Sequence, residues 1–456
     1  MDPYAGTLHI WGYITGAVIS GELAGFSTGY KYGLGSMIVA HVFTSILMIC
    51  VSVNLVELTT TLPFTSGSAT FAKAAYGGAV GFIIGVAYLC DMIFFGLEAC
   101  QFFAVVLQTA FETSDAVNFG YWVATIALCF VLNMRPKVFF NVIMGISIVS
   151  VLCILVPILV FSSQFNAANA WKTILPDGNI TNIWFPFGVW GVIQSFPHSL
   201  YLVVCFESLP VSVEEADNVG SNMPRGMFAA VGILLGLSWI SLILCAGLPP
   251  FASELQKSDV PFLTIFSKLL PDGLGFIVWI IALPPIFASQ LSLFYAGTRF
   301  AYGLSRSGYL PSILSCTTAH GAPYISMGFI SFIWLLFGAI LTFQQDSATS
   351  PIYLSIGSMF ALIAYIVEPL VYVKLKYSLV NIPRPFKISE LSGISTSMAS
   401  FFIAMSFLLG KIVTDRFWQW GFLSIVILYI TAIPFITLLC VTISKILQKN
   451  YSSRKS

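Results

Sequence analysis

The sequence carries very little charge. Only 9% of its 456 residues are Asp, Glu, Lys or Arg, whereas an ordinary soluble domain has roughly 25%. So few charges cannot cover the surface of a water-soluble globular enzyme of this length, which excludes that class. The 20 basic and 19 acidic residues nearly cancel, so we expect no nucleic-acid partner. Instead the chain is 57% hydrophobic, with a mean hydropathy of +0.91, which is typical of a protein embedded in a lipid bilayer.

The sequence also lacks the motifs of several chemistries. It has only four histidines, scattered at His9, His41, His198 and His320, and no Walker loop, GxSxG or HExxH motif. The nine cysteines fall almost all inside apolar runs without paired spacing, as expected of packing residues. We therefore expect no metal site, no cofactor and no enzymatic activity.

Long apolar runs predict an all-α integral membrane protein with about twelve transmembrane helices, because each crossing needs roughly 20 apolar residues. These runs are too long for the strands of a membrane β-barrel. The predicted spans lie in residues 7–30, 32–56, 74–90, 116–134, 138–171, 178–206, 226–253, 273–298, 325–343, 347–367, 391–410 and 417–444. The third of these helices continues beyond residue 90 and carries Asp91 and Glu98.

The distribution of basic residues predicts the orientation. With the amino terminus inside, 14 of the 20 Lys and Arg residues lie in cytoplasmic segments and 6 in outer ones, which is the bias expected of a membrane protein. We therefore expect a multi-pass protein of the plasma membrane with both termini cytoplasmic, ending in a short tail at 447–456. The sequon at Asn179 falls on the outer side, where it is a candidate for N-glycosylation.

Six acidic residues lie in or at the edge of predicted spans: Glu22, Glu57, Asp91, Glu98, Glu207 and Glu368. A carboxylate at bilayer depth is costly unless it faces a polar cavity or a partner. No Lys or Arg lies near the predicted middle of any span, so protons, inorganic cations, a cationic ligand or backbone dipoles must neutralise these acids. Glu57 and Glu368 lie near cytoplasmic ends, where helix-end contacts suffice. Asp91 is the best candidate for a charge that lines a cavity.

Two predicted spans are poorly suited to form continuous helices. Residues 16–29 contain four glycines, and residues 195–210 contain two prolines, a histidine and a carboxylate. If spans one to five and six to ten form two repeats, each interrupted helix opens one of them, which in a transporter marks the binding site near the midplane. An unwound turn offers free N–H and C=O groups to a small ligand that bears an amine and a hydroxyl or carboxylate. The alternative is that the glycines serve close helix packing.

Several motifs occur in the order typical of one known family. These motifs are residues 57–63 followed by 66–68, the acids at 207 and 214–215 followed by Pro224 and Arg225, and residues 298–311. Together they resemble the amino acid–polyamine–organocation superfamily. The closest likeness is to ethanolamine permeases, and it is carried by residues 18–22, Asp91, Pro197, Glu207 and 383–387. Leu291 and Cys205 depart from the ethanolamine-permease pattern, which has a histidine and a glycine there.

The resemblance implies a single domain over residues 1–456 with a leucine-transporter-like fold. Helices one to five (7–162) and six to ten (184–378) would form an inverted repeat, with helices eleven and twelve (395–446) outside it. It also implies secondary active transport of a small amine-containing solute, an amino acid or an ethanolamine-like molecule, by alternating access and driven by protons. The alternatives are an exchanger or uniporter of the same fold and a nutrient sensor.

The resemblance places the solute between the two interrupted helices. The N–H groups of Ser20, Gly21 and Glu22 would receive a carboxylate, whereas an ammonium would favour Glu22, Asp91 and the carbonyl groups near Val203 and Val204. Tyr201 would close over the solute, with Cys205 in the same turn. We expect Glu207, together with Asp91, to couple transport to protons; for sodium, the alternative ion, Ser289 and Ser292 could supply oxygen ligands.

Overall fold

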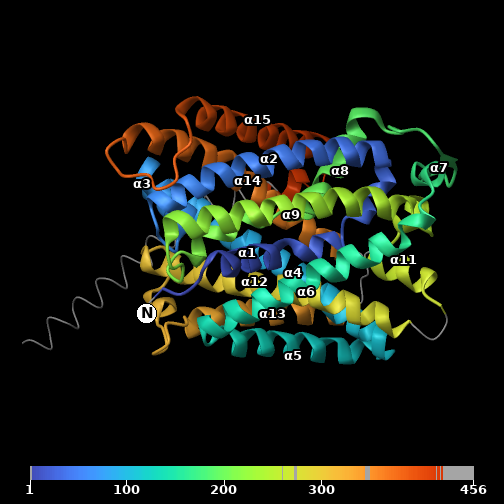
Figure 1. Ribbon diagram of the computed structural model, residues 1–456, viewed down its shortest axis with the longest axis horizontal. Helices are drawn as coiled ribbons and strands as arrows, with labels where there is room; N and C mark the ends of the chain where they lie inside the picture. Colours follow the sequence, from blue (N-terminus) through green and yellow to red (C-terminus); the bar gives the residue numbers. More distant parts are fainter. Residues whose placement is uncertain are drawn as a thin grey trace, which may run out of the picture.

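The computed structural model of the protein describes residues 3–258, 260–271, 275–344, 350–416, 418–421 and 423–424. Almost all of this part is helical, and the long helices lie side by side along one direction (Figure 1). Helices suit a bilayer because each satisfies its backbone N–H and C=O groups within its own segment. The all-α membrane fold that the sequence predicts is confirmed.

Within the described residues, nine helical segments are long and apolar enough to cross a membrane. They are α2 (Leu34–Thr61), α4 (Gly78–Phe111), α6 (Pro136–Phe161), α8 (Gly188–Tyr201) with η4 (Phe206–Ser212), α9 (Val219–Gly247), α12 (Phe276–Arg306), α13 (Tyr324–Gln344), α14 (Ser350–Ser378) and α15 (Glu390–Thr414). The shorter α5 (Asp115–Asn133) and the interrupted first helix occupy two further predicted spans. The predicted twelfth span at 417–444 lies almost entirely outside the described residues, as does the tail at 447–456.

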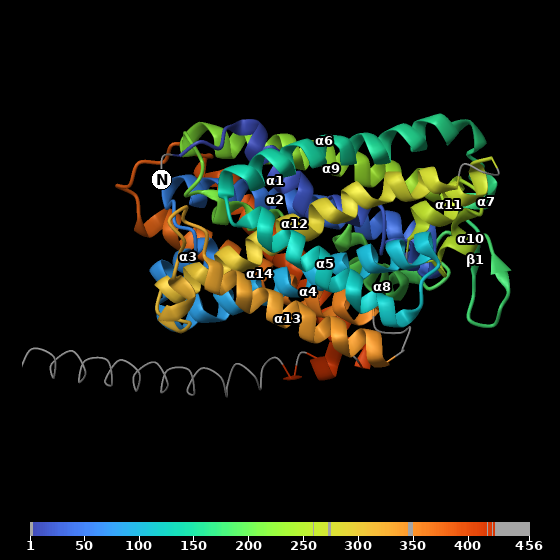
Figure 2. The ribbon, with the colours of Figure 1, turned by 90° about the horizontal axis from the view of Figure 1, so that it is seen from below.

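Short elements cap both ends of the bundle (Figure 2). At the end that holds the start of the chain lie α3 (Gly67–Tyr76) and η5 (Ser312–Ser315). The opposite end holds η3 (Ser162–Gln164), α7 (Ala167–Ala170), the antiparallel pair β1 (Thr173–Ile174) and β2 (Ile180–Thr181), α10 (Phe251–Leu255) and α11 (Pro261–Leu269). The spans predicted at 138–171, 178–206 and 226–253 were therefore too long. The connecting segments at 162–171, 178–187 and 248–253 carry no charged residue, so the absence of charge overestimates the length of a span.

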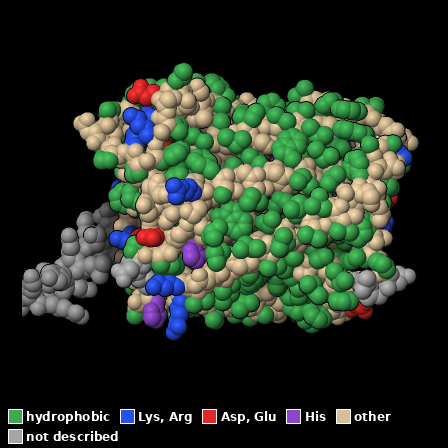
Figure 3. Space-filling model, viewed as in Figure 1, with side chains coloured by type: hydrophobic (Ala, Val, Ile, Leu, Met, Phe, Trp, Pro, Cys, Tyr) green, Lys and Arg blue, Asp and Glu red, His purple; other side chains and the backbone are tan. Residues whose placement is uncertain are grey.

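The surface has an apolar middle. Hydrophobic side chains cover most of the face shown in Figure 3, and the Lys, Arg, Asp, Glu and His side chains gather mainly near one end. On α6, for example, Val156, Leu159 and Val160 are 50%, 55% and 64% exposed. Isolated apolar side chains are common on soluble proteins, but a continuous belt over membrane-length helices suits contact with lipid. The chain is a multi-pass membrane protein.

Both predicted helix interruptions are confirmed. The first helix, α1 (Thr7–Val18), gives way to two 3-10 segments, η1 (Ile19–Glu22) and η2 (Ser27–Tyr32), separated by a turn. In the second, α8 ends at Tyr201 and residues 202–205 are not helical. This break follows Pro197 by several residues, since Pro197 itself lies inside α8. It ends at Cys205, whose φ of 81° is in the left-handed region that favours glycine.

Candidate functional site

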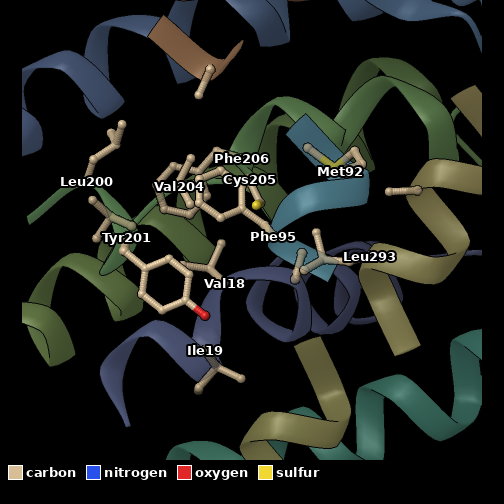
Figure 4. Close-up of a cluster of buried hydrophobic side chains, with 14 of the residues drawn as sticks. Val18, Ile19, Met92, Phe95, Leu200, Tyr201, Val204, Cys205, Phe206 and Leu293 are labelled. Atoms are coloured by element: carbon tan, nitrogen blue, oxygen red, sulfur yellow. The ribbon is translucent and has the colours of Figure 1, made fainter. Parts of the chain in front are cut away.

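The two interruptions lie directly against each other. A Cβ atom built on Gly21 would lie 2.2 Å from the carbonyl oxygen of Tyr201 and 3.1 Å from the Cα atom of Leu202. The main chains of η1 and the α8 break are therefore in direct contact, which only a glycine permits here. Figure 4 shows Val18 and Ile19 of the first interruption close to Tyr201 of the second.

Helix α12 packs against the first interruption and forms hydrogen bonds with it. The Ser20 N–H donates to Ser289 Oγ at 2.9 Å, and Ser289 Oγ donates to the Gly16 carbonyl at 2.8 Å. One hydroxyl thus satisfies a donor and an acceptor that the end of α1 leaves without helical partners. Ser292, three residues further on, places its hydroxyl 2.7 Å from where a Gly16 Cβ would be. The two serines predicted as ion ligands therefore both lie against the end of α1.

Asp91 and Glu207 form a buried pair of acids. Asp91 comes from α4 and Glu207 from η4, both are fully buried, and their carboxyl groups are neighbours. Glu207 Oε2 accepts a hydrogen bond from the Tyr365 hydroxyl of α14 at 2.6 Å. Among the residues that the structure describes, neither oxygen of Asp91 accepts a hydrogen bond from a nitrogen or a hydroxyl side chain. Two adjoining carboxylates repel each other, so a proton or a cationic group must neutralise this pair.

Glu22 does not join that pair. Its buried carboxyl group has Ser241 and Cys245 of α9 as neighbours. The sequence predicts that an ammonium favours both Glu22 and Asp91; in this conformation the Glu22 carboxyl lies beside α9, whereas the Asp91 carboxyl lies beside Glu207 of η4. The 3-10 conformation of residues 19–22 sets this direction, and the sequence alone does not reveal it.

Tyr201 covers the interruptions. Its ring packs against Phe95 and Phe102 of α4, with centroid distances of 5.7 Å and 6.3 Å. The ring also contacts the main chain of the first break, since a Gly25 Cβ would lie 2.8 Å from Tyr201 Cε1, and its hydroxyl lies near Ser20. Val203, Val204 and Cys205 are buried, and Figure 4 shows Val204 and Cys205 in the same cluster as Tyr201. The site is therefore closed in this conformation.

Three further side chains belong to this region: Tyr365 and Glu368 of α14 and Tyr88 of α4. The sequence analysis did not single out the two tyrosines. Tyr365 binds Glu207, and the Tyr88 hydroxyl of α4 donates to Glu368 Oε2. Glu368 was expected to make only helix-end contacts, but it is 2% exposed and within electrostatic range of Glu207. The sequence holds a signal that could have found them, because each helix carries a tyrosine followed three residues later by an acid.

Helix-end contacts do explain Glu57, as predicted. Its carboxylate accepts hydrogen bonds from Lys376 Nζ at 2.5 Å, the Tyr372 hydroxyl at 2.7 Å and Arg384 Nη1 at 2.8 Å. This cluster fastens the end of α2 to the end of α14 and the segment that follows it.

A second buried ion pair lies at the same end of the molecule. Arg299 of α12 binds the Glu215 carboxylate, which also accepts from the Tyr295 hydroxyl at 2.9 Å. The Tyr4 and Ala5 N–H groups donate to the Glu215 carbonyl at 3.0 Å and 2.8 Å. The start of the chain is thus fastened to the loop that follows the second interruption.

The glycosylation candidate Asn179 lies at the opposite end, in the exposed β1–β2 turn. Its backbone N–H and its side-chain amide donate to Asp177 at 3.0 Å and 2.8 Å. These hydrogen bonds hold the pKa of Asp177 below its usual value. The sequon is therefore accessible at the surface.

Comparison with known proteins identifies the family. The sequence model of the family described as "Amino acid permease" matches residues 6–433. The branched-chain amino acid permease BcaP of Bacillus subtilis is 21% identical over 91% of this chain and 90% of its own length. An uncharacterised transporter of Rhizobium meliloti is 23% identical over 73% of this chain and 71% of its own length. The lysine-specific permease LysP of Lactococcus lactis is 22% identical over 63% of this chain and 59% of its own length. With the interrupted helices and the family match in agreement, this chain belongs to the amino acid permease family of the amino acid–polyamine–organocation superfamily, a family of membrane transporters.

Proposed function

We propose that this protein is a secondary active transporter that carries one small amine-containing solute at a time by alternating access. The solute would bind where the two interruptions meet. The observation that carries this proposal is the contact between the Gly21 main chain and the Tyr201 carbonyl, with buried carboxyl groups around it. Interrupted helices that meet near the midplane are how such transporters expose main-chain groups to a solute.

The chemistry of the site favours a solute with an ammonium group. Asp91 and Glu207 offer negative charge without a basic partner among the described residues. Tyr201 adds an aromatic face, and a cation–π contact with it would contribute about 1–2 kcal/mol. Relatives include permeases for branched-chain amino acids and for lysine, which supports an amino acid as one substrate class to test; an ethanolamine-like amine is the other.

A carboxylate on the solute would have fewer donors than the three expected. The Ser20 N–H already donates to Ser289. Gly21 and Glu22 belong to the 3-10 segment η1, so their N–H groups would have to leave the hydrogen bonds of that segment to receive a carboxylate. An amino acid would therefore bind its carboxylate at residues 21–22 and its ammonium toward Asp91. An alkanolamine would need only the second contact.

Protons are the proposed coupling ion. A carboxyl group in the Asp91–Glu207 pair must be neutralised whenever no cationic solute is bound, and proton uptake on one side with release on the other achieves this. Sodium is the alternative, with Ser289 and Ser292 as oxygen ligands. An exchanger or uniporter would need no net ion movement.

We further propose the membrane topology. Residues 7–162 and 184–378 would form the inverted repeat, both termini would be cytoplasmic, and the protein would reside in the plasma membrane. The β1–β2 turn would then face outward. Expression in eukaryotic cells tests this orientation: an endoglycosidase-sensitive mobility shift should disappear in Asn179→Gln, and a cytoplasmic location of the turn would give no shift.

Uptake into proteoliposomes tests the function. Wild-type protein should exchange labelled ethanolamine, L-leucine or L-lysine at equal pH and accumulate it when a pH step is imposed. Glu207→Gln should abolish the accumulation while exchange continues, because the fixed neutral amide cannot cycle a proton. Unchanged accumulation by Glu207→Gln would exclude this role, and sodium-dependent accumulation without any response to pH would favour the sodium alternative.

A further inference from the structure

Four titratable side chains lie where α4 and α14 meet. On α4, Tyr88 and Asp91 are three residues apart, and on α14, Tyr365 and Glu368 are also three apart. Residues with this spacing lie on one helix face, about 4.5 Å apart along the axis. Tyr88 donates to Glu368, while Tyr365 donates to Glu207, which adjoins Asp91.

The contact between Tyr88 and Glu368 lies at a different depth along the helices from the Asp91–Glu207 pair. Helix α4 begins just after α3, at the end of the molecule that holds the start of the chain, and runs away from it (Figure 2). Helix α14 runs toward that end, since the Tyr76 hydroxyl at the end of α3 donates to the Leu370 carbonyl at 3.1 Å. Consequently the Tyr88–Glu368 pair lies about one helical turn closer to that end than Glu207 and Asp91.

A route continues from this pair to a cavity. Ser68, in the first turn of α3, is a buried neighbour of the Tyr88 hydroxyl. Residues on either side of Ser68, namely Ser66, Thr70 and Lys73, line a cavity of about 390 Å³. Polar side chains thus extend from the Asp91–Glu207 pair through Tyr88 and Glu368 toward a cavity at the predicted cytoplasmic end.

Glu368 has no basic partner along this route. In the part of the chain that the structure describes, its hydrogen bond comes from Tyr88 and its other oxygen, Oε1, has no hydrogen-bond partner. The charged or titratable groups on the elements packed against α14 are Tyr88, Asp91 and Glu98 of α4, Glu207 of η4, Glu57 and His41 of α2, Lys73 and Tyr76 of α3, Glu390 and Lys411 of α15, and His198 and Tyr201 of α8. The basic Lys376 and Arg384 bind Glu57 instead. A carboxyl buried in this way is well suited to hold a proton.

We propose that Tyr88 and Glu368 form a proton relay between the Asp91–Glu207 pair and the cavity beside α3, with Glu368 as the site that stores the proton. The proposal rests on the proton coupling proposed above. In one transfer, Glu368 takes the hydroxyl proton of Tyr88 while the Tyr88 oxygen takes the proton leaving Glu207. One proton moves, Tyr88 is regenerated, and Glu368 then releases its proton toward the cavity.

The conformation described here interrupts this relay. Glu207 is bonded to Tyr365 and Tyr88 is bonded to Glu368, so the transfer between Glu207 and Tyr88 needs a rearrangement. This interruption has a functional advantage, since a continuous chain would let protons cross without solute. We therefore expect movement of the interrupted helix that carries Glu207 to complete the relay.

Proteoliposome transport separates the relay from solute binding. Labelled ethanolamine, L-leucine and L-lysine are the probes, and each variant is measured for exchange at equal pH and for accumulation driven by a pH step. Glu368→Gln and Tyr88→Phe should lower accumulation at least tenfold and change exchange less than twofold. Tyr76→Phe is the matched control, because it also removes a tyrosine hydrogen bond to α14, but outside the relay, and should change neither.

The same measurements distinguish failure of the relay from failure of the proposed function. If both relay variants accumulate solute like the wild type, or lose exchange as fully as accumulation while folded, the relay is excluded and the proposed function stands. If wild-type protein exchanges solute but never accumulates it on a pH step, proton coupling and the relay are both excluded. Should Glu368→Gln fail to fold, Tyr88→Phe decides the question, since it keeps the aromatic ring.

Discussion

Substitution of Gly21 by alanine tests whether the two interruptions meet as described. The new Cβ would lie 2.2 Å from the Tyr201 carbonyl oxygen, whereas an ordinary contact begins near 3.4 Å. The two main chains would therefore have to separate by about 1.2 Å, and no side-chain rotation can relieve the clash. Overpacking of this kind costs about 3 kcal/mol, which corresponds to a loss of roughly 100-fold in the population of the closed site.

Gly232→Ala is the matched control. Gly232 lies within α9, and a Cβ there would meet nothing within 4 Å, so alanine should be neutral or stabilise the helix by up to about 1 kcal/mol. Exchange of labelled ethanolamine, L-leucine and L-lysine should fall at least tenfold in Gly21→Ala and stay at the wild-type rate in Gly232→Ala. If Gly21→Ala exchanges solute like the wild type, the inferred contact between the interruptions is wrong.

Two other sites give predictions for stability. Glu215→Gln leaves the buried Arg299 without its main carboxylate partner and should destabilise the protein by about 3 kcal/mol, whereas Glu214→Gln, at a side chain that is 36% exposed, should cost under about 1 kcal/mol; equal melting temperatures in detergent would contradict this ranking. Ser289→Ala removes the hydroxyl that bridges Gly16 and Ser20 and should cost about 1–3 kcal/mol, more than Ser292→Ala, whose hydroxyl makes no hydrogen bond within the described residues. Thermal unfolding of both variants checks this order, and a reversed order would show that Ser289 does not support the interruption.

The sequence predicts the architecture well because a bilayer imposes simple rules. Apolar length predicts the spans, and the glycines of residues 16–29 predict the first interruption. The second is harder to locate, since Pro197 is accommodated inside α8 and the break ends at Cys205, which adopts a conformation typical of glycine. The ends of the spans were also misplaced, because uncharged loops resemble membrane segments in composition.

The pairing of the buried acids could not be predicted from the sequence. Which carboxyl faces which helix depends on how each helix is rotated about its axis and how the unwound residues turn. The Glu22 carboxyl lies beside α9 and the Asp91 carboxyl beside Glu207, although all three residues lie in or at the edge of predicted spans. Likewise, the contact between Tyr88 and Glu368 joins residues 280 positions apart, and only the packing of α4 on α14 brings them together.

Cys205 can report directly whether the solute occupies the junction of the two interrupted helices, as we propose. Its thiol lies in the junction, and the exposed Cys316 serves as an internal control. Alkylation of each cysteine can be followed by peptide mass spectrometry in reconstituted protein, with and without saturating amounts of the transported solute. If the solute binds at the junction, it should slow alkylation of Cys205 at least tenfold and leave Cys316 unchanged. Equal rates at Cys205 with and without solute would contradict it.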